Sequence, residues 1–244
     1  MGSSGAGTIG LIGGMSWESS AEYYRLLNVE TRRRFGGYHC ARSLMLTVDF
    51  AEIEAMQRAD DWDAAGRLLA DAARRLEAGG ADVILLCTNT MHIVAEQIQA
   101  AVSVPFLHIL DAVGAGVRAA GVRRVGLLGT KYTMNAAFYR EKLARDFGIE
   151  VVVPDEKGRR DVHDVIYDEL TQGRVEDASR DRYVEVVGEL AARGAEGVVL
   201  GCTEITLLFA GHEDASPLPL FDSTALHVRR ALDLVASRPE AAAT

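Results

Sequence analysis

The feature that most constrains the fold is the alternation of short apolar runs with longer amphipathic segments along the chain. Apolar runs of this kind are typical of strands in a parallel sheet that helices cover on both faces. In the first half we expect strands at 8–14, 43–50, 82–86 and 104–109, and helices at 16–35, 61–80, 91–101 and 111–120. The sequence therefore predicts an α/β fold.

The second half repeats this order. Cys87 has a counterpart in Cys202, 115 residues later, and Tyr24-Arg25 recurs as Tyr139-Arg140 at the same spacing. Further strands are expected at 124–130, 149–154 and 216–223, and helices at 136–143 and 180–196. The shared spacing predicts two α/β halves of the same topology, and two unrelated α/β units with similar strands are the alternative.

Composition and charge exclude several classes of protein. The net charge is −9 and basic residues form only short clusters, so we expect no nucleic-acid partner. Apolar runs are too short to span a membrane. Three cysteines, an odd number, follow a start that lacks the features of a secretory signal. We therefore expect a cytoplasmic protein with reduced thiols.

Cys87 and Cys202 are the candidate catalytic residues. Each follows an apolar strand, and parallel sheets bind ligands beyond the carboxyl ends of their strands. Each also precedes a helix, whose first N–H groups would lower the thiol pKa. If the halves face each other across a pseudo-twofold axis, the two thiols approach one carbon from opposite sides, as inversion of a stereocentre requires. The alternative role of either cysteine is a small buried hydrophobe, and Cys40, which has no counterpart, is expected to be structural.

Polar residues around the two cysteines suit an amino-acid substrate. Thr88, Asn89 and Thr90 offer hydroxyl, amide and hydroxyl groups to a carboxylate. Thr203 repeats the first of these, and Glu204 could hold an ammonium group or orient the second thiol. Helix N-capping is the alternative role for these residues. The loops after the first strand of each half would line the same cleft with Met15, Ser16, Thr130 and Thr133.

We expect neither a cofactor nor a metal. None of the three lysines has an evident Schiff-base setting, and no histidine pairs with Cys or Asp at metal-ligand spacing. The glycines of "GLIGGMS" do not have dinucleotide-binding spacing. His92 lies five residues after Cys87 and could tune it, and His108 is a second candidate, with a core position as the alternative for both.

The segments "TIGLIGGMSWESSAEYYRLLN", "VDFAEIEAMQ", "LLCTNTMH", "LLGTKYTM" and "GCTEI" resemble the aspartate/glutamate racemase family, in particular its broad-specificity branch. The resemblance implies a cofactor-independent racemase in which Cys87 and Cys202 form the acid–base pair. It also implies a homodimer of chains with two flavodoxin-like domains, 1–103 plus 218–244 and 104–217, and an active site in the cleft between them. Residues matching family positions that contact substrate or line the pocket are Met15, Gln57, Thr88, Asn89, Thr90, Thr130, Thr133 and Thr203.

The chain departs from the strict aspartate racemases in its basic residues. Residues 49–57 contain no arginine, so Gln57 is a candidate replacement, and the expected lysine falls at Arg160 or Asp161. We therefore expect racemisation of aspartate, glutamate or both, with the substrate side chain left open. The alternatives are an isomerase or decarboxylase of a dicarboxylic acid on the same scaffold, or a non-catalytic amino-acid-binding module.

Overall fold

The computed structural model describes residues 7–237, which form two compact units. The first contains residues 7–109 and 227–237, and the second contains residues 110–226. The sequence predicted domain boundaries after residues 103 and 217, and the two compact units change over after residues 109 and 226. Phe106 still pairs with Ile84 of the first sheet, and the strand Leu220–Asp222 pairs within the second sheet.

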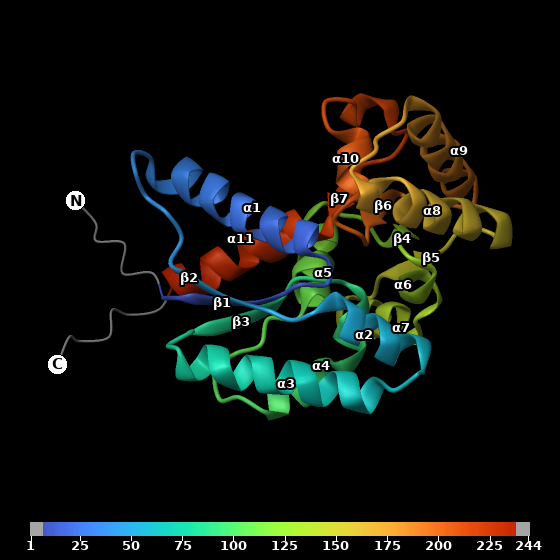
Figure 1. Ribbon diagram of the computed structural model, residues 1–244. Coiled ribbons are helices and arrows are strands. Elements are labelled where there is room, and N and C mark those ends of the chain that lie inside the picture. The colour runs from blue at the N-terminus through green and yellow to red at the C-terminus, as the bar shows by residue number, and fades with distance from the viewer. Residues whose placement is uncertain (1–6, 238–244) are drawn as a thin grey trace. The chain divides into compact units, whose positions relative to one another are not determined.

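The first unit contains a parallel sheet of three strands. These are β1 (Ile9–Gly13), β2 (Ser43–Thr47) and β3 (Val83–Leu86), in the order β2-β1-β3 (Figure 1). Ile12 lies opposite Leu46 on one side and Leu86 on the other. The strand expected at 104–109 is reduced to a single bridge between Ile84 and Phe106, because a helix already begins at Ile109.

Helices cover both faces of this sheet. They are α1 (Trp17–Phe35), α2 (Phe50–Arg58), α3 (Trp62–Ala78), η1 (Thr90–Val94), α4 (Ala95–Ala100) and α11 (Ser223–Ala236), which starts in the second unit. Figure 1 shows α1 and α11 along one face and α3 and α4 along the other. Alternate residues of β1 enter the two cores, Leu11 with Leu27 and Ile12 with Leu69. Burial on both faces explains why the strand is apolar throughout.

Local capping explains where the first elements begin. The Ser16 hydroxyl accepts a hydrogen bond from the Ser19 N–H and caps α1, so the helix expected from residue 16 begins at Trp17. The strand expected at 43–50 ends early, at Thr47, and the carboxylate of Asp49 instead caps α2, a helix that the apolar pattern had not indicated.

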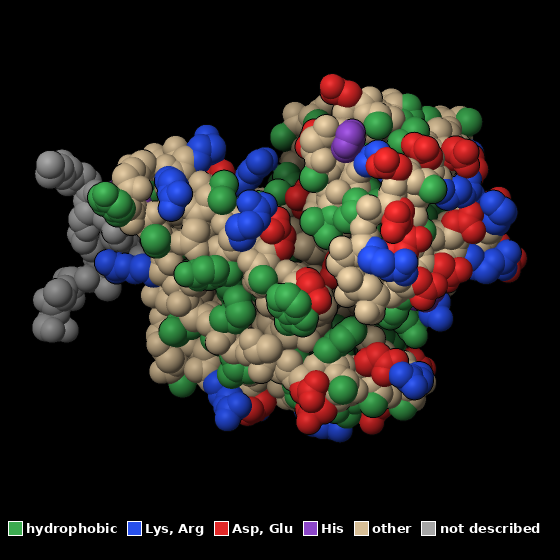
Figure 2. Space-filling view, turned by 45° about the horizontal axis from the view of Figure 1, so that its top comes forward, with side chains coloured by type: hydrophobic (Ala, Val, Ile, Leu, Met, Phe, Trp, Pro, Cys, Tyr) green, Lys and Arg blue, Asp and Glu red, His purple; other side chains and the backbone are tan. Residues whose placement is uncertain are grey.

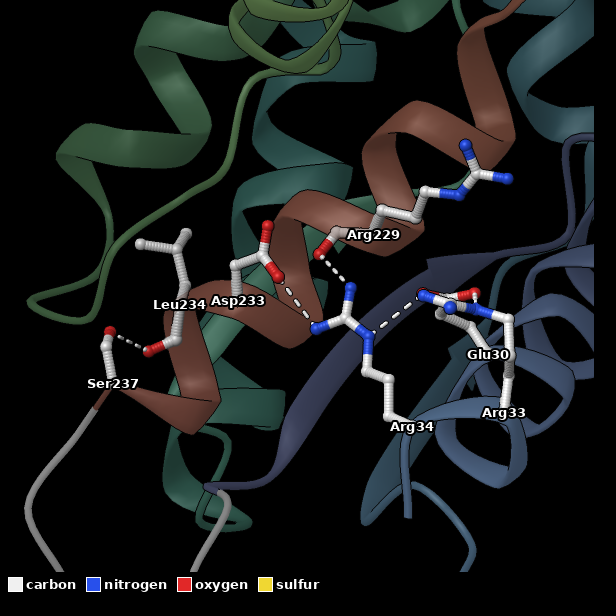
Figure 3. A network of polar contacts seen from close by, with 7 residues as sticks. All are labelled: Glu30, Arg33, Arg34, Arg229, Asp233, Leu234 and Ser237. Carbon is white, nitrogen blue, oxygen red and sulfur yellow. Dashed lines mark hydrogen bonds and ion pairs between the residues drawn. The ribbon is translucent and has the colours of Figure 1, made fainter. Parts of the chain in front are cut away.

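An ion-pair network joins α1 to α11 (Figure 3). Glu30 accepts two hydrogen bonds from Arg33, at 2.6 and 2.8 Å, and a third from Arg34 at 2.9 Å. Arg34 reaches Asp233 of α11 at 2.7 Å and the carbonyl oxygen of Arg229 at 3.4 Å. The Glu30 side chain is 9% exposed, so these contacts are shielded from water on the carboxylate side.

The sheet of the second unit arranges its first three strands in the same order as the sheet of the first unit. Its parallel strands β4 (Arg124–Leu128), β5 (Glu150–Val152), β6 (Gly197–Leu200) and β7 (Leu220–Asp222) are arranged as β5-β4-β6-β7. In both sheets the first strand of the unit lies between the second and the third, and β7 takes the place that Phe106 occupies in the first sheet. The prediction of two halves with one topology is confirmed.

The helices of the second unit are α5 (Ile109–Ala119), α6 (Lys131–Asn135), α7 (Ala137–Phe147), α8 (Glu156–Asp168), η2 (Leu170–Gln172), α9 (Asp177–Ala192), α10 (Ile205–Phe209) and η3 (Glu213–Ala215). Glycines allow close packing at two places. A Cβ on Gly114 of α5 would lie 2.3 Å from the Phe147 ring, and one on Gly126 of β4 would lie 2.7 Å from Leu190 of α9.

Charges of both signs are mixed on the surface that α8 and α9 form (Figure 2). Asp161 pairs with Lys157 and Arg182, and Arg182 also reaches Glu185 and Glu189. Among the helices within residues 7–237, none has the length and hydropathy needed to cross a membrane.

Candidate active site

Cys87 lies directly beyond the carboxyl end of β3. Its backbone N–H donates to the Ile12 carbonyl oxygen at 2.9 Å, which continues the ladder with β1. Its side chain is fully buried in the apolar cluster that contains Tyr23, Leu107 and Val228. The thiol therefore belongs to the core face that α1 and α11 cover.

Cys202 lies beyond β6 in a more polar setting. The residue as a whole is partly exposed, but its thiol is desolvated and donates to Glu204 Oε2 at 2.9 Å. Glu204 itself is only 6% exposed. The Cys202 thiol is therefore in direct contact with a buried carboxyl group of the second unit.

The two cysteines do not occupy equivalent ladder positions. In the second sheet the N–H that corresponds to that of Cys87 belongs to Gly201, which donates to the Leu128 carbonyl oxygen at 2.7 Å. Cys202 is one residue further from the strand, at the position of Thr88. Both Thr88 and Cys202 are partly exposed, whereas Cys87 and Gly201 are buried. The 115-residue spacing therefore overstates the equivalence of the two thiols, because one residue of offset reverses the direction of a side chain.

The expected lowering of the two thiol pKa values is wrong. Burial raises the pKa of Cys87 well above the usual range of a thiol. Burial, followed by the negative charge of Glu204, raises the pKa of Cys202. The helical segments that follow, η1 and α10, have only five residues each, so their N-terminal N–H groups do not offset desolvation.

The segment after Cys87 forms a polar loop. Asn89 is 5% exposed, and Thr88 and Thr90 on either side of it are partly exposed. Asn89 occupies the N-cap position of η1, yet its side chain makes no cap hydrogen bond. Helix capping therefore does not account for the amide at this position.

His92 does not contact the thiol through its ring nitrogens. Nδ1 lies 2.8 Å from the Thr88 carbonyl oxygen, and Nε2 lies 3.1 Å from the backbone nitrogen of Ile109. The expected direct tuning of Cys87 by His92 is thus not what the structure shows. The ring of His108, the second candidate, lies beside that of His92, with centroids 4.6 Å apart and the two planes tilted by 50°.

The other candidates of the first unit have mainly structural contacts. Met15 is buried in the apolar cluster of Ile53 and Leu86. Ser16 caps α1, and the amide of Gln57 donates to the Met91 sulfur at 2.9 Å. Ser20, a residue that the sequence did not single out, accepts from the Gly14 N–H at 2.8 Å and donates to the Ser16 carbonyl oxygen at 2.9 Å. Ser20 could have been found from the sequence, because it lies four residues after the N-cap residue Ser16 and so on the same side of the helix.

The threonines of the second unit lie around the ends of β4 and β6. Thr130 caps α6 and lies 3.3 Å from the hydroxyl of Thr133, which is fully buried. The Thr133 side chain packs against Gly129 and Gly201, the residue before Cys202. Thr203 is buried, and its hydroxyl lies 3.4 Å from that of Thr224.

Arg160 and Asp161, the two positions where the family lysine was expected, form ion pairs with other charged residues and not contacts with these threonines. Arg160 pairs with Glu156 at 2.5 Å, and Asp161 pairs with Arg182 at 2.7 Å. His163, one helical turn away on α8, instead accepts from the Lys131 N–H at 3.4 Å, directly after Thr130. Its side chain was missed because only the fold of α8 against α6 brings it to this position.

Cys40 lies before β2 and is exposed, and all three cysteines are free. Within residues 7–237, no three His, Cys, Asp or Glu side chains are grouped as a metal site would require.

The fold and these residues define a two-unit parallel α/β protein with one cysteine beyond the third strand of each sheet. The profile of the Asp/Glu/Hydantoin racemase family matches residues 12–231, and the chain belongs to this family. The resemblance seen in the sequence is thereby confirmed.

Individual relatives agree with this assignment. The crystal structure of a candidate Asp/Glu racemase from Yersinia pestis has a TM-score of 0.87 and 46% identity, over 94% of this chain and 99% of that one. An aspartate racemase homologue from Pyrococcus horikoshii OT3 has a TM-score of 0.84 and 34% identity, over 95% and 99%. The broad specificity amino-acid racemase RacX of Bacillus subtilis is 37% identical over 95 residues, which span only 41% of that curated relative.

Proposed function

We propose that the protein is a cofactor-independent racemase that interconverts the L- and D-forms of aspartate, glutamate or both. The observation that carries the proposal is the placement of Cys87 and Cys202 beyond corresponding strands of two like sheets, in a chain of the Asp/Glu/Hydantoin racemase family. Thiols are suited to both halves of the reaction, because a thiolate accepts a proton and a thiol donates one.

In the proposed reaction one cysteine is a thiolate and the other is a thiol. The thiolate takes the proton from Cα, and the bonding electrons pass into the α-carboxylate as an enediolate. The other thiol then delivers its proton to the opposite face of Cα. The configuration is inverted, no atom is gained or lost, and the two cysteines have exchanged protonation states.

Glu204 is proposed to accept the proton of Cys202 when that residue acts as the base. The hydrogen bond of 2.9 Å between Sγ and Oε2 supplies the route. In Glu204→Gln the amide cannot take up the proton, so we expect kcat to fall by about 100-fold when Cys202 is the base. The pKa of Cys202 should fall at the same time, because a negative charge beside it has been removed.

The loop of Thr88, Asn89 and Thr90 is proposed to hold the α-carboxylate, with Thr130, Thr133 and Thr203 as further polar contacts. Met15, Ser16 and Gln57 are proposed to line the substrate site. Donors on the α-carboxylate stabilise the enediolate more than the substrate, because negative charge grows on those oxygens during the reaction.

Positive charge for the side-chain carboxylate is proposed to come from Lys131, with His163 as a donor beside it. His163 lies against the Lys131 backbone, and burial lowers its pKa, so it is neutral at physiological pH. We expect Lys131→Met to raise KM for aspartate and glutamate more than for alanine. Equal changes for all three substrates would contradict this assignment.

The function is tested by chiral chromatography of L- and D-aspartate and glutamate in deuterated water, with Cys87→Ser, Cys202→Ser and Cys40→Ser prepared in parallel. The wild type and Cys40→Ser should form the opposite enantiomer with deuterium at Cα. Each of the other two variants should lose racemisation by orders of magnitude. A near-normal rate in either would reject the two-base scheme.

Other outcomes separate the alternatives. Loss of carbon dioxide, or a change of skeleton without deuterium uptake at Cα, would assign a decarboxylase or isomerase of a dicarboxylic acid. Saturable binding without turnover would assign an amino-acid-binding module.

We also propose that the protein acts as a homodimer in the cytoplasm. Three free thiols suit a reducing compartment. Trp17, Tyr24 and Phe35 of α1 are 69%, 55% and 50% exposed, and such large apolar side chains favour burial against another chain. Light scattering after size-exclusion chromatography should give twice the mass of the chain.

A further inference from the structure

We infer that His92 is a positioning residue, which orients the peptide group between Thr88 and Asn89 so that the Asn89 N–H faces the substrate carboxylate. The inference rests on the proposed function, in which this loop holds the α-carboxylate. His92 lies in the first unit, is 2% exposed and sits beside His108. Its role follows from the two hydrogen bonds of its ring.

The hydrogen bonds determine which nitrogen carries the proton. A backbone N–H can only donate, so Nε2 must be the acceptor for Ile109 at 3.1 Å. The Thr88 carbonyl oxygen can only accept, so Nδ1 must donate to it at 2.8 Å. His92 is therefore a neutral imidazole with the proton on Nδ1. Burial, with the neighbouring His108 and His227, lowers its pKa well below the usual value, which agrees with this form.

The contact with Thr88 sets the direction of the next donor. In a trans peptide the C=O of one residue and the N–H of the next point in opposite directions, and no cis bond is present between Thr88 and Asn89. Because His92 draws the Thr88 carbonyl toward itself, the Asn89 N–H points to the other side of the loop. Rotation of this peptide group would present a carbonyl oxygen in that direction and repel a carboxylate.

The contact with Ile109 anchors the histidine. Ile109 is the first residue of α5, so its N–H lacks a partner within that helix. Nε2 of His92 accepts a hydrogen bond from this N–H. The imidazole ring is therefore held at both nitrogens, by Thr88 four residues before it and by Ile109 17 residues after it. The loop after Cys87 is thereby fastened to the point where the chain leaves the first unit.

Two variants separate the two hydrogen bonds. The side-chain amide of Asn can occupy the place of Nδ1, and that of Gln can reach the place of Nε2. His92→Asn should keep the donor to Thr88 and lose the acceptor for Ile109, and His92→Gln should do the reverse. Each loses one buried hydrogen bond, so their losses of stability should be similar. His227→Gln is the control, because His227 is equally buried but bonds Tyr23 and Leu107 instead of the loop.

The measurements are kcat, KM and the ¹⁵N–¹H signal of Asn89. We expect kcat of His92→Asn to remain within about tenfold of wild type and that of His92→Gln to fall about 100-fold, the effect of losing one anion-stabilising donor. The Asn89 signal should move in His92→Gln and stay in place in His92→Asn and His227→Gln.

The outcomes distinguish this inference from the proposed function. Equal kcat losses in the two His92 variants of an active racemase, or an Asn89 signal that moves equally in both, would overturn the positioning role. A wild type that racemises nothing, with the Asn89 signal still responding only to His92→Gln, would reject the proposed function and retain the orientation of the peptide by His92.

Discussion

The ion-pair network between α1 and α11 makes Glu30 a measurable source of stability. The hydrogen bonds from Arg33, and then those from Arg34, lower the pKa of Glu30 from its ordinary 4.5 to about 2 against the opposing effect of burial. Such a shift corresponds to at most about 3 kcal/mol at neutral pH. Arg33 is 69% exposed, which weakens its contribution through solvent screening. We therefore expect Glu30→Gln to lower the free energy of unfolding by about 1–2 kcal/mol.

The pH dependence gives the sign of the effect. Because the folded state holds the proton of Glu30 less tightly than the unfolded state, the stabilisation is complete above 4.5 and is lost as the pH falls through about 2. The difference between wild type and Glu30→Gln should therefore shrink on acidification below 4.5. Urea unfolding followed by circular dichroism, repeated over this range, measures it.

Glu22→Gln is a matched control on the same helix. Glu22 also accepts two hydrogen bonds from an arginine three residues later, Arg25, at 2.6 and 2.7 Å. Its side chain is 27% exposed and reaches no second helix through these bonds, so the expected loss is below about 0.5 kcal/mol. Equal losses in Glu22→Gln and Glu30→Gln, or a Glu30→Gln difference that is unchanged in acid, would refute the reasoning.

Two further predictions concern the backbone and the thiols. Gly14→Ala should lower stability by about 2–4 kcal/mol or prevent folding, because Gly14 has φ of 102° and a Cβ there would lie 2.1 Å from a backbone oxygen; an unchanged melting temperature would contradict this. Cys40, which is exposed, should react with Ellman's reagent in the native protein, whereas the fully buried Cys87 should react only after unfolding; loss of the fast phase in Cys40→Ser checks the assignment.

Local patterns in the sequence were enough to predict the fold class. Buried parallel strands are apolar throughout, and amphipathic helices have a different period, so the order of elements can be read without knowledge of their contacts. The start of the first helix could be predicted in the same way, because the hydrogen bond by which Ser16 caps it spans only three residues. The short helices Phe50–Arg58 and Lys131–Asn135 were not predicted, because neither is long enough to show a clear period. The longer helices Glu156–Asp168 and Ser223–Ala236 were not predicted either.

The candidate site was predicted less completely, because its chemistry depends on residues distant in the chain. Spacing placed Cys87 and Cys202 beyond strands, but the ladder contacts with Ile12 and Leu128 showed that they stand one residue out of register. The sequence also could not indicate that desolvation would outweigh the adjoining helical N–H groups in the thiol pKa values.

The sequence by itself thus determined the alternation of strands and helices, the repeat, and which residue types follow each strand, since these are properties of neighbours along the chain. Only the tertiary structure decided that His92 binds Ile109, that His163 lies beside Lys131, and that Cys87 is buried. Burial and hydrogen-bond partners depend on which distant segments pack together, and that choice is a property of the whole folded unit.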